Sequence, residues 1–234
     1  MKYDILAFGA HPDDVELGCG GTIAKSLSQK KKVAIIDITR GELGTRGSID
    51  IRNKESSKAN KILGINHREN LDLNDGFFKN DKKSQLIVIS KIREFKPDIV
   101  LCNAAEDRHI DHGKGSNLVN DSCFLSGLEK IETFDFNNNK QEVWRPKIVL
   151  EYIQWNEVKP DFILISACDF LLLNLNVNGI RKRSRTPTRT HKHVYTQPRA
   201  HTNTCTHKHM PTHAYTCTRA HTVSYTHLRA HETD

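Results

Sequence analysis

Apolar segments and amphipathic segments alternate along the first two thirds of the chain. Short apolar or β-branched runs bounded by turn residues predict strands over residues 4–8, 32–38, 67–73, 99–102 and 147–152, with a sixth beginning at 162–165. Apolar residues at helical spacing predict helices over residues 15–29, 50–63, 82–95 and 113–128. This alternation favours an α/β fold: a Rossmann-like, doubly wound, mostly parallel sheet with flanking helices.

The pattern stops near residue 181, so we divide the chain into a domain at residues 1–180 and a Thr/His-rich basic tail at residues 181–234. The domain is native-like to about residue 163. The net charge of +7 divides into +8 for the tail and −1 for the domain. Because the tail has little apolar surface to offset its ordering entropy, we expect it to be disordered.

Thr and His alternate locally in the tail, as in residues 190–191 and 205–207. An alternating A-C nucleotide repeat encodes this alternation, so a frameshift or sequencing artefact is the favoured interpretation. The alternative is a functional tail that binds metal or nucleic acid through its histidines and basic residues.

The near-neutral domain gives no electrostatic reason to expect a nucleic-acid or membrane partner. No apolar run approaches the roughly 20 residues that span a bilayer, and the first residues lead directly into a predicted strand, without a signal peptide. Four cysteines in residues 1–180 lack paired spacing and are expected to be reduced thiols of a cytoplasmic protein. They are Cys19, Cys102, Cys123 and Cys168.

The turn after the first predicted strand, at residues 10–16, carries the first candidate chemistry. His11 and Asp14 offer an imidazole nitrogen and a carboxylate oxygen to a divalent metal ion. Asp13 lies between them and is well placed to take a proton from water at such a metal. The alternative is an ordinary turn in which Pro12 fixes the backbone and Asp14 caps the following helix.

A second cluster, residues 106–112, follows the strand at residues 99–102. Three of the four histidines in residues 1–180 lie in these two turns. If the strands are ordered 3-2-1-4, the two turns face each other at the carboxyl edge of the sheet, where open α/β sheets place their sites. His11, Asp14 and His112 would then form a catalytic zinc shell with water in the fourth position. The alternative for the second cluster is a solvated charged loop.

A Gly-rich loop at residues 39–49 also follows a strand end and holds Arg40, Glu42 and Arg46. Surface loop charges are usually only solvated, but this loop lies beside the proposed metal site. Arg52 follows in the next helix, where its alternative role is an ion pair with Glu55 on the surface.

The sequence also predicts both ends of the next helix and one weaker site candidate. Asp50 is expected to cap the helix that holds Arg52, and Gly64 to end it. Asp75 lies in an Asn-Asp-Gly turn, which makes it a weaker site candidate because Asp-Gly is typical turn chemistry.

Residues 10–16 together with residues 109–112 resemble the LmbE/PIG-L family of zinc-dependent N-acetylglucosamine deacetylases. The resemblance covers about residues 1–163. Several further segments resemble the branch of that family that removes acetyl from N-acetylglucosaminyl malate in bacillithiol biosynthesis. These segments are residues 39–48, Arg52, Glu55, residues 70–76 and Arg145-Pro146.

The resemblance implies one Zn²⁺ ion per chain, or another divalent ion, bound by His11, Asp14 and His112. It also implies Asp13 as general base. His109, oriented by Asp111, would stabilise the oxyanion or protonate the leaving amine, and we expect the Asp111 carboxylate to raise the pKa of His109. The partner would be a small N-acetylglucosaminyl substrate, and the protein a homo-oligomer. The substrate candidates are Arg52, Arg46, Glu42 and Asp75.

Overall fold

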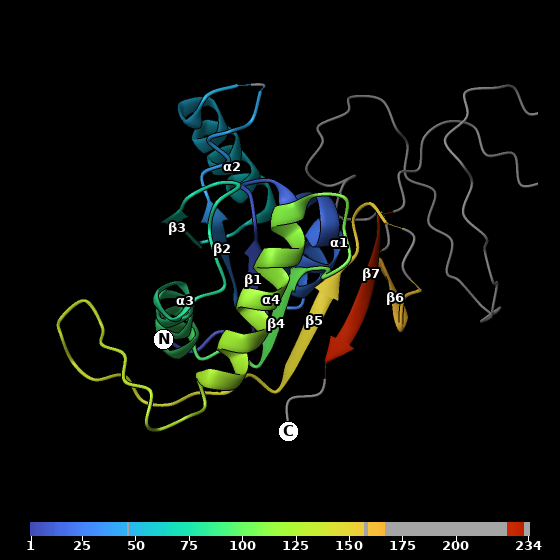
Figure 1. Ribbon diagram of the computed structural model, residues 1–234. Coiled ribbons are helices and arrows are strands. Elements are labelled where there is room, and N and C mark those ends of the chain that lie inside the picture. Colours follow the sequence, from blue (N-terminus) through green and yellow to red (C-terminus); the bar gives the residue numbers. More distant parts are fainter. Residues whose placement is uncertain (46, 157–158, 167–223, 232–234) are drawn as a thin grey trace, which may run out of the picture.

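The computed structural model describes residues 1–45, 47–156, 159–166 and 224–231 (Figure 1). Five parallel strands form the centre of its sheet, in the order β3-β2-β1-β4-β5. This topology confirms the predicted α/β class and the predicted 3-2-1-4 order. The strands are β1 (Ile5–Gly9), β2 (Val33–Thr39), β3 (His67–Leu73), β4 (Ile99–Asn103) and β5 (Ile148–Tyr152).

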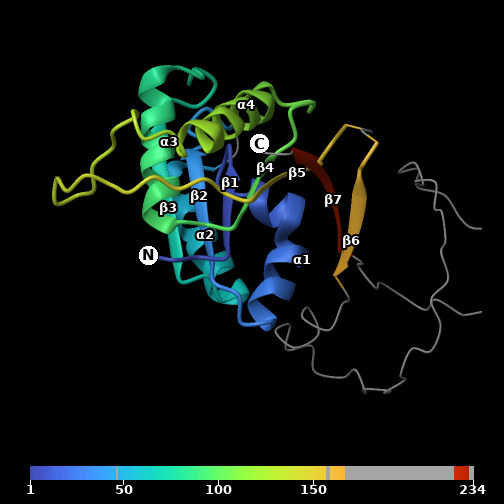
Figure 2. The ribbon, with the colours of Figure 1, turned by 90° about the horizontal axis from the view of Figure 1, so that it is seen from below.

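Four helices cover the two faces of this sheet. They are α1 (Asp14–Ser28), α2 (Ile49–Leu63), α3 (Lys82–Phe95) and α4 (Ile110–Leu125). In Figure 2 the sheet runs between α4 above and α1 below. Alternate strand residues therefore enter two separate cores: Leu6 and Phe8 pack with α3 and α4, whereas Ile5 and Ala7 pack with α1.

Two helix starts differ from the sequence-based expectation. Ser48, rather than Asp50, caps α2 by accepting a hydrogen bond from the Ile51 N–H at 3.3 Å. Helix α4 begins at Ile110, three residues earlier than expected, because the His109 side chain serves as its cap. The predicted end of α2 is confirmed, since Gly64 has a left-handed φ of 81°.

The described part of the tail forms a strand. β7 (Ser224–His231) pairs antiparallel with β5 on one side and with β6 (Phe162–Ser166) on the other. This differs from the disorder expected for the tail. Without β7, β5 would present an open edge, and the Tyr-Thr pair in β7 has high strand propensity. The other tail residues, and with them the artefact and binding interpretations, lie outside the described residues.

The cysteines in the described part of the chain are unpaired. Cys19, Cys102 and Cys123 are buried free thiols, while Cys168 lies outside the described residues.

Gly18 is required by packing, because a Cβ at this position would collide with the Tyr152 ring of β5.

Within the described segments, no helix combines the length and the apolar character that crossing a membrane requires.

Candidate active site

The turn between β1 and α1 is held in place by a residue from the neighbouring strand. Asn103, at the end of β4, accepts a hydrogen bond from the Ala10 N–H at 2.9 Å and donates one to Asp14 Oδ2 at 3.1 Å. Asp14 Oδ2 also accepts the His11 backbone N–H at 2.9 Å. Gln154, just beyond β5, donates to Asp14 Oδ1 at 3.3 Å. The Asp14 carboxylate is therefore fixed from three strands.

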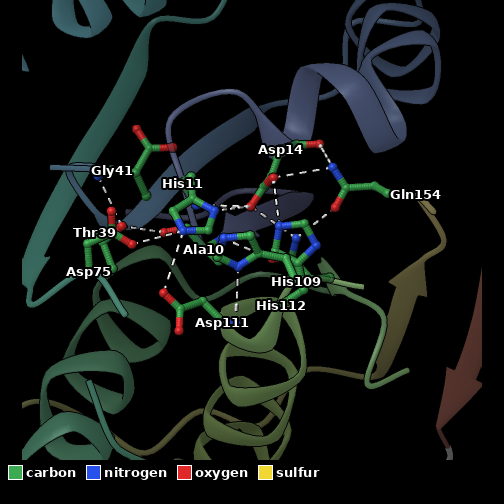
Figure 3. Close-up of polar contacts among 12 residues, drawn as sticks. Ala10, His11, Asp14, Thr39, Gly41, Asp75, His109, Asp111, His112 and Gln154 are labelled. Carbon is green, nitrogen blue, oxygen red and sulfur yellow. Dashed lines mark hydrogen bonds and ion pairs between the residues drawn. The ribbon is translucent and has the colours of Figure 1, made fainter. Parts of the chain in front are cut away.

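The three predicted metal ligands come together at this point (Figure 3). One Asp14 oxygen lies 3.4 Å from His11 Nδ1, and the other lies 3.1 Å from His112 Nε2. His112 reaches this position because α4 starts early enough to place it in the first turn. The three side chains are buried, at 9%, 3% and 3% exposure for His11, Asp14 and His112.

The outer ring nitrogens of both histidines face further carboxylates. His11 Nε2 is hydrogen-bonded to Asp75 Oδ1 at 3.1 Å, and His112 Nδ1 lies 3.1 Å from Asp107 Oδ1. Metal-binding histidines usually have such an outer partner, which fixes the ring orientation. Asp75, predicted as a substrate contact, is buried here and its second oxygen accepts the Leu43 N–H at 2.9 Å. Asp75 also lines the cavity, and one of its oxygens lies within 4.8 Å of a His11 nitrogen and an Asp111 oxygen, so its predicted substrate contact stays a prediction.

Charge at this cluster favours a cation. Burial lowers the pKa of His11, but Asp14 and then Asp75 and Asp111 outweigh that effect and raise the pKa to about 9. Burial alone would raise the pKa of Asp14, yet hydrogen bonds to His11 and His112 hold it well below the usual range. The donor set of two imidazoles and a carboxylate fits a divalent ion of the zinc class.

His109 approaches the same cluster from the solvent side. Its ring centroid lies 4.6 Å from that of His11 and 5.1 Å from that of His112, and one nitrogen from each of the three rings lies within 4.8 Å of the others. His109 therefore completes a compact set of three nitrogens, whereas Asp14 contacts His11 and His112 through two different oxygens. Asp14 is buried between the two inner nitrogens, whereas His109 is exposed.

The expected contact between the Asp111 carboxylate and the His109 ring is wrong. The carboxylate instead accepts hydrogen bonds from the Gly76 N–H at 2.6 Å and Lys114 Nζ at 3.1 Å. His109 Nδ1 accepts the Asp111 backbone N–H at 3.3 Å, because the cap geometry turns the ring toward the helix end. The pKa of His109 is lowered, first by burial and then by His11 and His112, rather than raised.

A cavity of about 440 Å³ opens over these groups. Asp13 lines it, and burial, followed by repulsion from Asp14, raises the pKa of this carboxyl, with Arg52 acting in the opposite direction. A carboxylate with a raised pKa is suited to accept a proton. The cavity also has lining residues that sequence reasoning missed: three lie in or next to the two predicted turns but carry no typical ligand group, and two lie beyond β5. They are Leu17, Arg108, Ile110, Gln154 and Trp155.

The Gly-rich loop packs against Arg52. A Cβ on Gly44 would collide with the Arg52 guanidinium, so the glycine permits this close approach. Arg52 lines the cavity, and its predicted contact with substrate stays a prediction. Glu42 is not among the lining residues, and its carboxylate accepts the Asp75 N–H at 2.8 Å. Arg46 lies outside the described residues, so its predicted substrate contact stays a prediction.

Comparison with known proteins assigns the family. A sequence model of the PIG-L family, described as GlcNAc-PI de-N-acetylase, matches residues 6–123, half of the chain. The chain belongs to the PIG-L family. The matched segment contains both histidine-bearing turns and every predicted metal ligand. The resemblance seen in the sequence is thereby confirmed at the level of the PIG-L family.

Relatives with this PIG-L domain include two curated proteins. An uncharacterized deacetylase of Escherichia coli, YaiS, is 39% identical over 115 residues, which cover 46% of this chain and 61% of the relative. The diacetylchitobiose deacetylase of Thermococcus kodakarensis is 27% identical over 141 residues, covering 56% and 53%. The chain thus spans between half and three fifths of the curated relatives it matches.

Solved structures show the same PIG-L fold. The conserved protein TT1542 of Thermus thermophilus superposes with a TM-score of 0.65 and 32% identity, over 71% of this chain and 73% of that one. The N,N'-diacetylchitobiose deacetylase of Pyrococcus horikoshii gives a TM-score of 0.62 at 23% identity, over 74% and 67%. The second likeness concerns the fold alone.

Replacing His109 with Gln distinguishes the two geometric ligand sets. We expect His109→Gln to retain its metal, because Asp14 completes the set with His11 and His112. The measurement is the metal content after dialysis against a chelator. If His109→Gln loses its metal, the three-imidazole set is the correct one.

Proposed function

We propose that this protein is a zinc-dependent deacetylase that removes the N-acetyl group from an N-acetylglucosaminyl conjugate. The convergence of His11, Asp14 and His112 beneath a cavity lined by Asp13 carries this proposal. The deacetylases among the PIG-L relatives support the reaction class. When bound by these three residues, zinc polarises a carbonyl oxygen and lowers the pKa of water.

The residues around the cluster divide the hydrolysis between them. Asp13 accepts the proton of the water that attacks the acetamide carbonyl, and the C–N bond then breaks to give acetate and an amine. His109 lies beside His11 in the cluster and supplies a hydrogen bond or a proton to the leaving amine. Asp75 and Asp107 hold the rings of His11 and His112 in position.

Among N-acetylglucosaminyl compounds, we propose the L-malate conjugate of bacillithiol biosynthesis as substrate. Malate carries two carboxylates, and guanidinium groups bind carboxylates in a bidentate manner. Arg52, in the first turn of α2, and Arg108, in the turn between β4 and α4, both line the cavity. The direct experiment follows acetate release from the malate conjugate and from plain N-acetylglucosamine. A higher kcat/KM for the conjugate supports the assignment, and equal values would point to another N-acetylglucosamine compound.

Replacing Arg52 with Ala tests the carboxylate contact. We expect kcat/KM for the malate conjugate to fall by about 10- to 100-fold, because a charged hydrogen bond is lost. Plain N-acetylglucosamine should be affected much less. Arg40→Ala is the matched control, since Arg40 belongs to the loop that leads to α2 but pairs with Asp72 at the surface. An Arg52→Ala protein with parental activity on both compounds would remove Arg52 from the substrate site.

A further inference from the structure

Trp155 occupies an unusual place at the mouth of the cavity. Its side chain lies just beyond β5 and is 60% exposed, although large aromatic side chains are normally well buried. The Arg108 guanidinium carbon lies 4.6 Å from the ring centroid, so a cation covers one face of the indole. Leu17 and Ile110, exposed by 70% and 66%, line the same cavity. Three exposed apolar side chains, Leu17, Ile110 and Trp155, therefore line a cavity that also holds charged groups.

The sheet order places Trp155 on a definite side of the cavity. The metal-ligand turns follow β1 and β4, in the middle of the sheet, and the loop leading to Arg52 follows β2 on one flank. Trp155 follows β5 on the other flank. Suppose that the acetamide of a substrate lies at the metal-ligand turns and that its anionic group lies at Arg52. Another part of the same substrate then faces Trp155.

We propose that Trp155 is the stacking face for the pyranose ring of an N-acetylated sugar. A pyranose presents C–H groups on its face and hydroxyls around its edge. The open indole face matches the first, while the Arg108 guanidinium lines the same cavity and matches the second. A plain hydrocarbon chain would offer no oxygen to the Arg108 guanidinium, and malate carboxylates match the arginines rather than an indole face. This inference rests on the proposed function and names the group that Trp155 selects.

The chain contains two tryptophans, Trp144 and Trp155, so a Trp144→Phe background makes fluorescence a reporter of Trp155 alone. We expect N-acetylglucosamine to change this emission saturably. N-acetylethanolamine, which has the acetamide but no ring, and N-hexylacetamide, which has an alkyl chain, should not change it. A response to N-hexylacetamide without one to the sugar would overturn the proposal. No response to the sugar at any concentration would do the same.

Kinetics in the otherwise unchanged chain give a second, independent readout. Trp155→Ala should raise KM by about 10-fold and leave kcat within about 3-fold, because a stacking contact serves binding rather than the chemical step. Trp155→Phe should restore most of the loss. Phe136→Ala is the control, since Phe136 is 94% exposed but does not line the cavity.

The two readouts separate this proposal from the proposed function. A saturable fluorescence response without acetate release would leave the stacking site standing and contradict the deacetylase. Acetate release with unchanged KM in Trp155→Ala would contradict the stacking site and leave the deacetylase standing.

Discussion

A protein carrying Asp13→Asn is expected to keep its metal and to release acetate roughly 10²–10⁴-fold more slowly, the usual worth of a proton-transfer group. The amide fills the same space as the carboxylate but cannot accept the proton of the attacking water. Asp13 lines the cavity beside the ligand Asp14, and burial raises the pKa of its carboxyl. Metal content and kcat are measured on the same preparation.

Asp121→Asn serves as the matched control for Asp13→Asn. Asp121 is an exposed acid on α4 whose carboxylate accepts a hydrogen bond from Asn80 at 2.7 Å, away from the cavity. We expect the control to retain parental turnover. If Asp13→Asn loses its metal together with its activity, Asp13 acts as a ligand or a structural group, and another base must be sought.

Replacing either His11 or His112 with Ala is expected to abolish tight metal binding and acetate release together. A shell with three protein ligands cannot easily lose one, and Asp14 would then be left with a single imidazole partner. The measurement is the number of metal ions per chain that survive dialysis against a chelator. We expect one fewer ion in each variant than in the parent.

The comparison with the parent is needed because residues 181–234 contain nine histidines, which every variant shares. His67→Ala is the matched control, since His67 pairs with Glu69 on β3, outside the cluster. It should retain the parental metal content. Metal content in His112→Ala equal to that in the His67→Ala control would refute the assigned site.

Much of the fold follows from local patterns in the sequence. The central strands β1 and β2 are buried along their whole length, so their apolar runs are unambiguous. The start of α4 was missed because Ile110 is exposed and the first turn is polar, which hides the helical period. The strand at residues 224–231 was missed because antiparallel pairing with β5 depends on backbone far away in the chain.

The centre of the site was also predictable, because parallel topology brings the turns after β1 and β4 to one edge. The surroundings were not, because they depend on contacts between distant segments. Asn103 and Gln154 reach Asp14 across 89 and 140 residues. The direction of the Asp111 carboxylate was wrong because proximity in sequence does not determine which way a side chain points from the first turn of a helix. It turns to Gly76 rather than to its sequence neighbour His109.

Removal and return of the metal tests the central claim most directly. The full chain is dialysed against a chelator until metal analysis shows the tight site to be empty, and acetate release from N-acetylglucosaminyl malate is then followed as zinc is added. The account predicts no acetate from the stripped protein and recovery of turnover that saturates with the refilling of the site lost in His112→Ala. Undiminished acetate release from the stripped protein, or none from the folded and reloaded protein, would contradict it.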